Sequence, residues 1–200
     1  MRLILVRHGE THHNRDGLGL GRADAELTER GRYQTRRAAE AAAAARPQRV
    51  YTSPLRRALE GGRLIAELCG APLEVREELA EMDVGFTEGL PLEEIRQRFP
   101  DFVREWLGAR PETVRMPGGE SLDDVARRLR RWLADVRQRE EETVAVVSHT
   151  FVLRVLLCLL LDLPLRRFRD FRCDLASVSE VEWNEGAVVR RWNDVCHLHG

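Results

Sequence analysis

Arginine and histidine side chains follow three apolar runs that have the length of buried β-strands. Arg7 and His8 end the first run, Arg56 follows the second, and His149 ends the third. Ligands of open α/β sheets bind outside the carboxyl ends of the strands, where the free N–H groups of helix N-termini also attract anions. A single histidine at a strand end is more often a structural loop residue. Convergence of all four side chains, which requires the strands to be neighbours, predicts a pocket for phosphate.

The elements that must position these side chains alternate between strand and helix. Apolar runs predict strands over residues 2–7, 49–52, 73–75 and 143–148, and the turn sequence "NEG" predicts a closing hairpin of 178–183 with 188–192. Four helices are predicted, over residues 29 to about 45, 54 to about 68, 122–136 and 151–161. The N-caps of the first three are Thr28, Ser53 and Ser121, and Pro54 takes the first helical position after Ser53. This order predicts an α/β fold, a three-layer α/β/α sandwich with a mostly parallel central sheet.

The chain is expected to form one domain, residues 1–200, because no linker or internal repeat divides it. Its 43% hydrophobic content suits a single core of this size. The less regular region 81–117 contains four prolines and two short helical patterns. We expect residues from about 85 to 117 to form a small helical cap inserted over the site.

Composition excludes several classes of function. A formal net charge of −1 offers no overall basic field, so nucleic-acid binding is not expected. The longest apolar stretch, 151–161, contains Arg154 and is too short to span a bilayer, and the N-terminal apolar run is too short for a signal peptide. The cysteines lack C-x-x-C spacing and are expected to be reduced thiols. These features predict a cytoplasmic protein that binds neither membranes nor nucleic acids.

The remaining histidines do not form a convincing metal site. His12 and His13 are adjacent on a loop, and His197 and His199 form a terminal H-x-H, without carboxylate or cysteine partners at ligand spacing. We therefore expect no metal and no other cofactor.

Seven sequence blocks carry a family resemblance. They are "RHGETHHN", "LTERG", "TSPLRRA", "EMDVGFTEG", "PGGES", "SHTFVLR" and "NDVCHL", which span residues 7–198. With the preceding strand they closely resemble the histidine phosphatase superfamily, in its phosphoglycerate mutase-like phosphatase branch. The ordered set is far more specific than "RHGE" alone.

The resemblance implies a role for each matching residue. His8 would be the nucleophile that forms a phosphohistidine, which water then hydrolyses. Arg7, Arg56 and His149 would bind the phosphoryl oxygens, and Asn14 would contact the bound phosphate. Gly21 and Thr150 are further expected substrate-binding positions.

Glu81 matches the family's acid, which protonates the leaving alkoxide and later accepts a proton from water. This role requires a raised pKa, which burial under the cap would supply. Asp83 is the local rival for the role, and Glu10 is another carboxylate near the nucleophile. Charge stabilisation by arginines and histidines implies an enzyme that works without metal.

Three departures from the family pattern bear on specificity. Thr150 and Phe151 stand where Gly-Gly is common, Leu20 replaces a polar residue, and "RALEGG" replaces the more usual small, polar continuation after the arginine. Leu20 cannot hydrogen-bond substrate, which points to a less polar leaving group or to one held elsewhere. Phe151 would narrow the pocket or make it less polar.

The sequence thus predicts a phosphomonoesterase, a hydrolase acting on a small phosphorylated metabolite. A cofactor-dependent phosphoglycerate mutase and a noncatalytic phosphate-binding regulatory protein are the alternatives. The substrate stays open among α-ribazole phosphate, phosphoserine, phosphoglycerate and a broad range of esters. A homodimer is expected from base rates alone.

Overall fold

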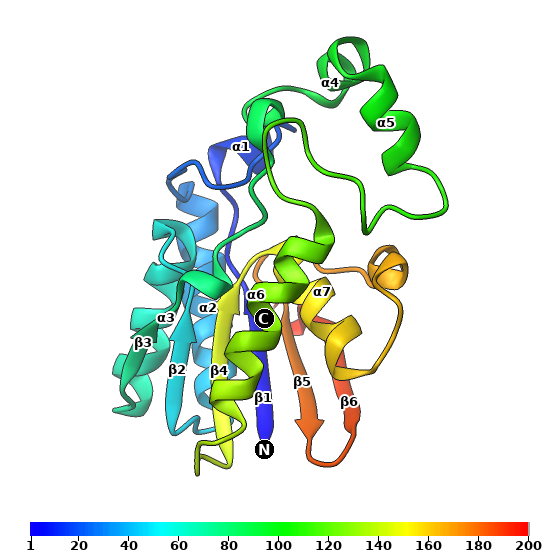
Figure 1. Ribbon diagram of the computed structural model, residues 1–200. Helices are drawn as coiled ribbons and strands as arrows, with labels where there is room; N and C mark the ends of the chain where they lie inside the picture. The colour runs from blue at the N-terminus through cyan, green and yellow to red at the C-terminus, as the bar shows by residue number, and fades with distance from the viewer. Residues whose placement is uncertain (200) are drawn as a thin grey trace.

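A six-stranded sheet forms the centre of the computed structural model, which describes residues 1–199 (Figure 1). Its strands are β1 (Arg2–Arg7), β2 (Arg49–Thr52), β3 (Leu73–Val75), β4 (Thr143–Ser148), β5 (Val178–Trp183) and β6 (Ala187–Asp194). They lie in the order β3-β2-β4-β1-β5-β6. The first four strands are parallel, and the hairpin β5–β6 adds antiparallel to β1. The predicted mostly parallel sheet is confirmed.

The register of the three central strands brings their carboxyl ends to one level. Arg7 pairs with Ser148, and Thr52 pairs with Val147. The ladder continues for one more step, because the His8 N–H donates to the Ser148 carbonyl at 3.2 Å and the Ser53 N–H donates to the Val147 carbonyl at 3.0 Å. The residues that follow the strands therefore meet at the same edge of the sheet.

Helices cover both faces of the sheet. They are α2 (Glu29–Ala43) and α3 (Arg56–Cys69) on one face, with α6 (Leu122–Val136) and α7 (Thr150–Leu160) on the other (Figure 1). Successive strand side chains alternate between the two cores: Leu3 and Leu5 pack towards α6 and α7, whereas Ile4 and Val6 pack towards α2 and α3. This alternation confirms the predicted three layers.

Two of the three predicted N-caps are found. The Thr28 hydroxyl accepts from the Gly31 N–H at 2.9 Å, and Ser121 forms a capping box with Asp124. The prediction that Ser53 caps α3 is wrong, since this helix begins at Arg56 with Leu55 as its N-cap. Ser53 is unavailable because its backbone extends the ladder to β4 and its hydroxyl contacts His149.

Two short helices stand apart from the sheet above its carboxyl edge, as Figure 1 shows at the upper right. They are α4 (Leu92–Arg98) and α5 (Pro100–Trp106), within the region expected to form a cap. The remaining short elements are α1 (His12–Arg15), η1 (Glu77–Leu79), η2 (Gly85–Thr87), η3 (Leu165–Asp170) and η4 (Cys196–Leu198). No helix within residues 1–199 has the length and apolar character needed to cross a membrane.

Candidate active site

His8 lies at the end of β1 with only 4% of its surface exposed. Its Nδ1 is 2.7 Å from the Gly9 carbonyl oxygen. A carbonyl oxygen only accepts hydrogen bonds, so Nδ1 carries the ring proton and Nε2 keeps its lone pair. Burial, with the charges of Arg57 and Arg7 adding to it, holds the pKa of His8 well below its usual value. The ring is therefore neutral near pH 7 and has a nucleophilic nitrogen.

His149 lies beside His8 at the end of β4, with 5.0 Å between the ring centroids. Its Nε2 is 2.7 Å from the Ser53 hydroxyl oxygen, which also accepts from the Leu55 N–H at 3.2 Å. The hydroxyl proton of Ser53 can point at Nε2, and in that tautomer the ring proton of His149 is on Nδ1. This Nδ1 is buried and has no partner among residues 1–199, so it can donate to a bound anion.

Two buried arginines flank the histidines. Arg7 donates from Nη1 to the Cys173 carbonyl at 2.6 Å. Arg57 is 1% exposed and donates to the carbonyls of Ala23 and Gly21 at 2.7 and 2.6 Å. Burial lowers the pKa of Arg57 to about 10, so both guanidinium groups stay charged near pH 7. Their Nε groups have no partner within residues 1–199.

The prediction that Arg56 converges with His8 is wrong, because Arg57 occupies that place. The Arg56 side chain is 62% exposed and pairs with Glu26 at 3.1 Å. The helical phase explains the change: the buried positions of α3 are Arg57, Ala58, Gly61, Gly62 and Ile65, which form one stripe facing the sheet. The spacing of Arg57 from Ile65 is the sequence signal that could have identified it.

Glu81 approaches the site from the loop between η1 and η2 and is 5% exposed. Its Oε1 accepts from the Met82 N–H at 2.8 Å, and its Oε2 accepts from the Phe151 N–H at 3.3 Å. Burial raises the pKa of Glu81, although these two hydrogen bonds and the charges of Arg57 and Arg7 oppose the rise. A raised pKa is the property expected of a general acid.

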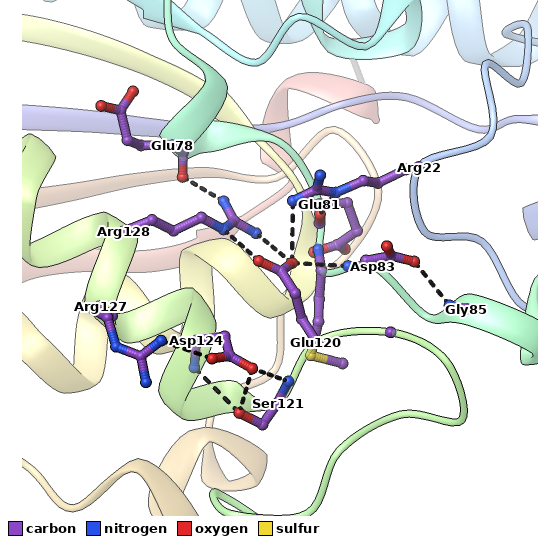
Figure 2. Close-up of polar contacts among 12 residues, drawn as sticks. Arg22, Glu78, Glu81, Asp83, Gly85, Glu120, Ser121, Asp124, Arg127 and Arg128 are labelled. Atoms are coloured by element: carbon purple, nitrogen blue, oxygen red, sulfur yellow. Dashed lines mark hydrogen bonds and ion pairs between the residues drawn. The ribbon is translucent and has the colours of Figure 1, made fainter.

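The rival carboxylates have other partners. Asp83 accepts from the Gly85 N–H at 2.9 Å and so stabilises a turn, as Figure 2 shows. Glu10 accepts from the Thr28 hydroxyl at 2.8 Å, beside the start of α2.

A network of charged side chains around the Glu120–Arg128 pair holds the loop that carries Glu81 (Figure 2). Glu120 receives two hydrogen bonds of 3.2 Å from Arg128, and its Oε2 also accepts from the Asp83 N–H at 2.9 Å. Arg128 additionally donates to the Glu78 carbonyl, and Arg22 pairs with Glu120 at 3.3 Å. The backbone is thereby fixed on both sides of Glu81. The sequence analysis missed this network, although Glu120 lies in the motif "PGGES" and Arg128 is a charged residue at a buried helix position.

The three expected substrate-binding residues differ in what they can offer. Asn14 uses its Oδ1 to accept from the Thr11 N–H and hydroxyl, which leaves its amide nitrogen as the available donor. The Gly21 N–H already donates to Glu88 and its carbonyl accepts from Arg57, so Gly21 positions the arginine. Thr150 opens α7, and its buried hydroxyl has no partner within residues 1–199.

The other histidines and the cysteines lie in different surroundings. His197 contacts the Ala176 carbonyl at 2.9 Å, and His12 is exposed on α1. Within residues 1–199, no three His, Cys, Asp or Glu side chains are grouped closely enough to hold a metal ion. The cysteines are free, as expected; they are Cys69, Cys158, Cys173 and Cys196.

The fold and site define a class of protein: an α/β protein with a neutral, buried histidine, two arginines whose charges act on it, and a buried carboxyl of raised pKa. A model of the histidine phosphatase superfamily (branch 1) matches residues 3–195. The chain therefore belongs to the histidine phosphatase superfamily, as its motifs predicted.

Named relatives agree with this assignment. The chain is 36% identical over 200 residues to phosphoserine phosphatase 1 of Hydrogenobacter thermophilus, covering 99% of this chain and 94% of the relative. It is 30% identical over 205 residues to a probable phosphoglycerate mutase of an Enterobacter species, and the match covers 99% of this chain and 95% of that relative. The structure of a mycobacterial glucosyl-3-phosphoglycerate phosphatase in complex with VO3 superimposes with a TM-score of 0.85 at 31% identity. The match covers 96% of this chain and 98% of that structure. The predicted phosphatase class is confirmed.

Proposed function

We propose that this protein hydrolyses small phosphomonoesters through a phosphohistidine formed on Nε2 of His8. The observation that carries the proposal is the hydrogen bond from His8 Nδ1 to the Gly9 carbonyl, because it leaves Nε2 unprotonated. The depressed pKa of His8 keeps the ring neutral over a wide range of pH. A neutral imidazole held in one tautomer is prepared for attack on phosphorus.

The reaction has two steps that balance in protons and bonds. In the first, the Nε2 lone pair of His8 forms a bond to phosphorus, the ester P–O bond breaks, and the leaving oxygen takes the proton of Glu81. In the second, water attacks phosphorus while the Glu81 carboxylate accepts a proton from it. The P–N bond then breaks, phosphate leaves, and His8 and Glu81 return to their starting states.

The charge that develops on the phosphoryl oxygens needs donors that are already in place. Arg7 and Arg57 supply fixed positive charge, and His149 supplies a donor through Nδ1. The Asn14 amide and the Thr150 hydroxyl complete the ring of donors. In this proposal Gly21 acts only through Arg57, and residues 85–117 act as the cap over the bound ester.

A test compares His8→Ala with His12→Ala, which removes an exposed histidine four residues away. We expect His8→Ala to reduce phosphate release from phenyl phosphate to background, and His12→Ala to leave kcat/KM unchanged. Full activity of His8→Ala would contradict the proposal. Inactivity of the wild type on all esters, with phosphate still bound, would favour the regulatory alternative.

A phosphoglycerate mutase would return the phosphoryl group to its substrate instead of releasing it. The assay therefore follows 3-phosphoglycerate by phosphorus NMR, which separates isomer interconversion from phosphate release. We expect release of phosphate. Net interconversion without release would establish the mutase.

The location and assembly of the protein stay predictions. We propose a cytoplasmic protein, which the free cysteines support. Sedimentation velocity of the purified chain tests the homodimer.

A further inference from the structure

An apolar pocket of about 310 Å³ lies between the cap helices and the body of the protein. Its wall is formed by Leu20 on the first loop, by α4 and α5, and by Phe151 on α7. Phe102 stacks on Trp106 with a centroid distance of 5.9 Å, and Trp106 meets Phe151 edge-on at 6.1 Å. This volume is at the lower end of the range for small-molecule sites. We call this feature the apolar pocket.

The apolar pocket begins beside the two groups that handle the leaving oxygen and the phosphoryl charge. Phe151 lines it with its side chain, while its N–H donates to Glu81 at 3.3 Å. Leu20 also lines it, and the next residue, Gly21, holds Arg57 through its carbonyl. A phosphomonoester bound at His8 would therefore direct its alcohol portion towards these side chains.

The polar groups around the apolar pocket are engaged elsewhere. The Thr87 hydroxyl donates to the Val84 carbonyl at 2.8 Å, and the Gly19 N–H donates to the Leu90 carbonyl at 2.9 Å. Arg96 is the one charged residue among the described lining residues; its side chain is 55% exposed and lies 3.7 Å from Glu93. No buried charge is thus in place for a carboxylate or an ammonium group, and burying either without a partner is costly.

Two leucines of the wall are more exposed than apolar side chains of a closed core. Leu92 at the start of α4 is 56% exposed, and Leu107 just after α5 is 68% exposed. An apolar ligand would cover them and remove their surface from water, which is favourable in proportion to the area covered.

We propose that the apolar pocket binds the alcohol portion of the substrate, and that the preferred substrates are phosphomonoesters of alkyl or aryl alcohols without charge near the ester. Phosphoserine and 3-phosphoglycerate, which carry a carboxylate on the carbon next to the ester carbon, are then poor substrates. This inference rests on the proposed function, because the phosphoryl group must lie at His8.

The test uses ethyl, butyl and hexyl phosphate, whose alcohols leave with similar intrinsic ease. We expect kcat/KM to rise by about fourfold for each added methylene group, as for transfer of a methylene out of water. Hexyl phosphate should also exceed phosphoserine and 3-phosphoglycerate. A flat chain-length series, or a preference for phosphoserine, would overturn the inference while leaving the proposed function intact.

Variants locate the effect in the apolar pocket. Leu20→Asn and Leu92→Asn should each lower kcat/KM for hexyl phosphate by about tenfold, and lower it much less for the shorter ethyl phosphate. Leu68→Asn is the matched control, because Leu68 is also a helical leucine with 56% exposure but lies on α3 outside the pocket. Equal effects of Leu92→Asn and Leu68→Asn would contradict the assignment. A 3-phosphoglycerate preference that Arg96→Gln abolishes would likewise overturn it.

Binding separates the inference from catalysis. Alkylphosphonates have a P–C bond in place of the ester, and their affinity for the wild-type protein is measured by calorimetry. We expect affinity to increase with chain length in the same proportion as kcat/KM. Chain-length-dependent binding without hydrolysis of any ester would sink the proposed function and support the pocket assignment. Binding independent of chain length would overturn the assignment.

Discussion

At the scale of single residues, the site depends on which atom of each side chain is left without a partner. His8 commits Nδ1 to the Gly9 carbonyl, and Arg57 donates one N–H from each terminal nitrogen to the loop of Gly21 and Ala23. The lone pair on Nε2 of His8 and the unpartnered Nε–H of Arg57 remain available to a phosphoryl group. Donors that are already in place stabilise the developing charge and need not reorient during the reaction.

The adjacent arginines provide a matched pair of variants. Arg57→Ala should lower kcat/KM for phenyl phosphate by about 10²–10³-fold, because a buried donor at the phosphoryl group is lost. Arg56→Ala removes an exposed side chain that pairs with Glu26, and kcat/KM should stay within about twofold of the wild type. Circular dichroism checks that both variants are folded. Equal losses in the two variants would contradict the assignment of Arg57.

Glu81 predicts a dependence on both pH and leaving group. The group must be protonated to act as an acid, so kcat/KM should fall as pH rises through its pKa, which burial places above the usual glutamate range. At low pH kcat/KM should fall as His8 gains a proton. This fall should occur at a pH below the usual histidine range, because the pKa of His8 is depressed. The pH profile of kcat/KM for butyl phosphate measures both limbs.

Removal of the Glu81 acid should lower kcat/KM most for esters whose alcohol is a strong base. Glu81→Gln should lower kcat/KM for butyl phosphate by about 10²–10⁴-fold and remove the high-pH limb. The loss should be much smaller for 4-nitrophenyl phosphate, whose leaving group needs no proton. Asp83→Asn is the control, since Asp83 caps a turn beside Glu81. A larger loss in the control would transfer the acid role to Asp83.

At the scale of elements, parallel register and helix phase decide which residues meet. The sequence patterns predicted β1 to β5 with the observed bounds, so the convergence of His8 with His149 followed from the sequence. The start of α3 did not follow, because Ser53 has a tertiary partner, His149, that local capping preferences do not include. The error at Arg56 has a different cause, because the phase of α3 turns Arg57 towards the sheet and leaves Arg56 exposed.

The Glu120–Arg128 network links α6 to the loop that carries Glu81. Arg128→Ala removes the two-point partner of the Glu120 carboxylate and should lower the free energy of unfolding by about 2 kcal/mol, as expected for the loss of hydrogen bonds to a charged group. Arg127→Ala is the neighbouring control on the exposed face of α6. It should change the free energy of unfolding by less than about 0.5 kcal/mol. Urea denaturation measures both. Equal values would show that the network contributes no more than a surface pair.

At the scale of the whole molecule, the fold was more predictable than the specificity. Strand and helix patterns are local and repeat along the chain, and they predicted the three layers directly. The apolar pocket gathers residues from the first loop, α4, α5 and α7, and no local pattern joins these segments. Leu20 and Phe151 already departed from the family motifs in the sequence. The structure shows that both side chains line the same pocket.

The charges that surround His8 also predict independence from metal ions. Arg7 and Arg57 lie near enough to lower its pKa, so they can balance phosphoryl charge themselves. Activity on phenyl phosphate should be unchanged after dialysis against a chelator. A loss that added Mg²⁺ or Zn²⁺ restores would contradict this part of the mechanism.

The central claim is tested most directly by trapping the phosphoenzyme. The wild type and His149→Gln are mixed with phenyl phosphate, quenched rapidly in alkali to preserve phosphohistidine, and digested for mass spectrometry. The account predicts one phosphorylated peptide, containing Arg7 to Asn14, with the phosphoryl group on His8. A phosphoryl group on His149 or another residue, or hydrolysis without any phosphoenzyme in the burst phase, would contradict it.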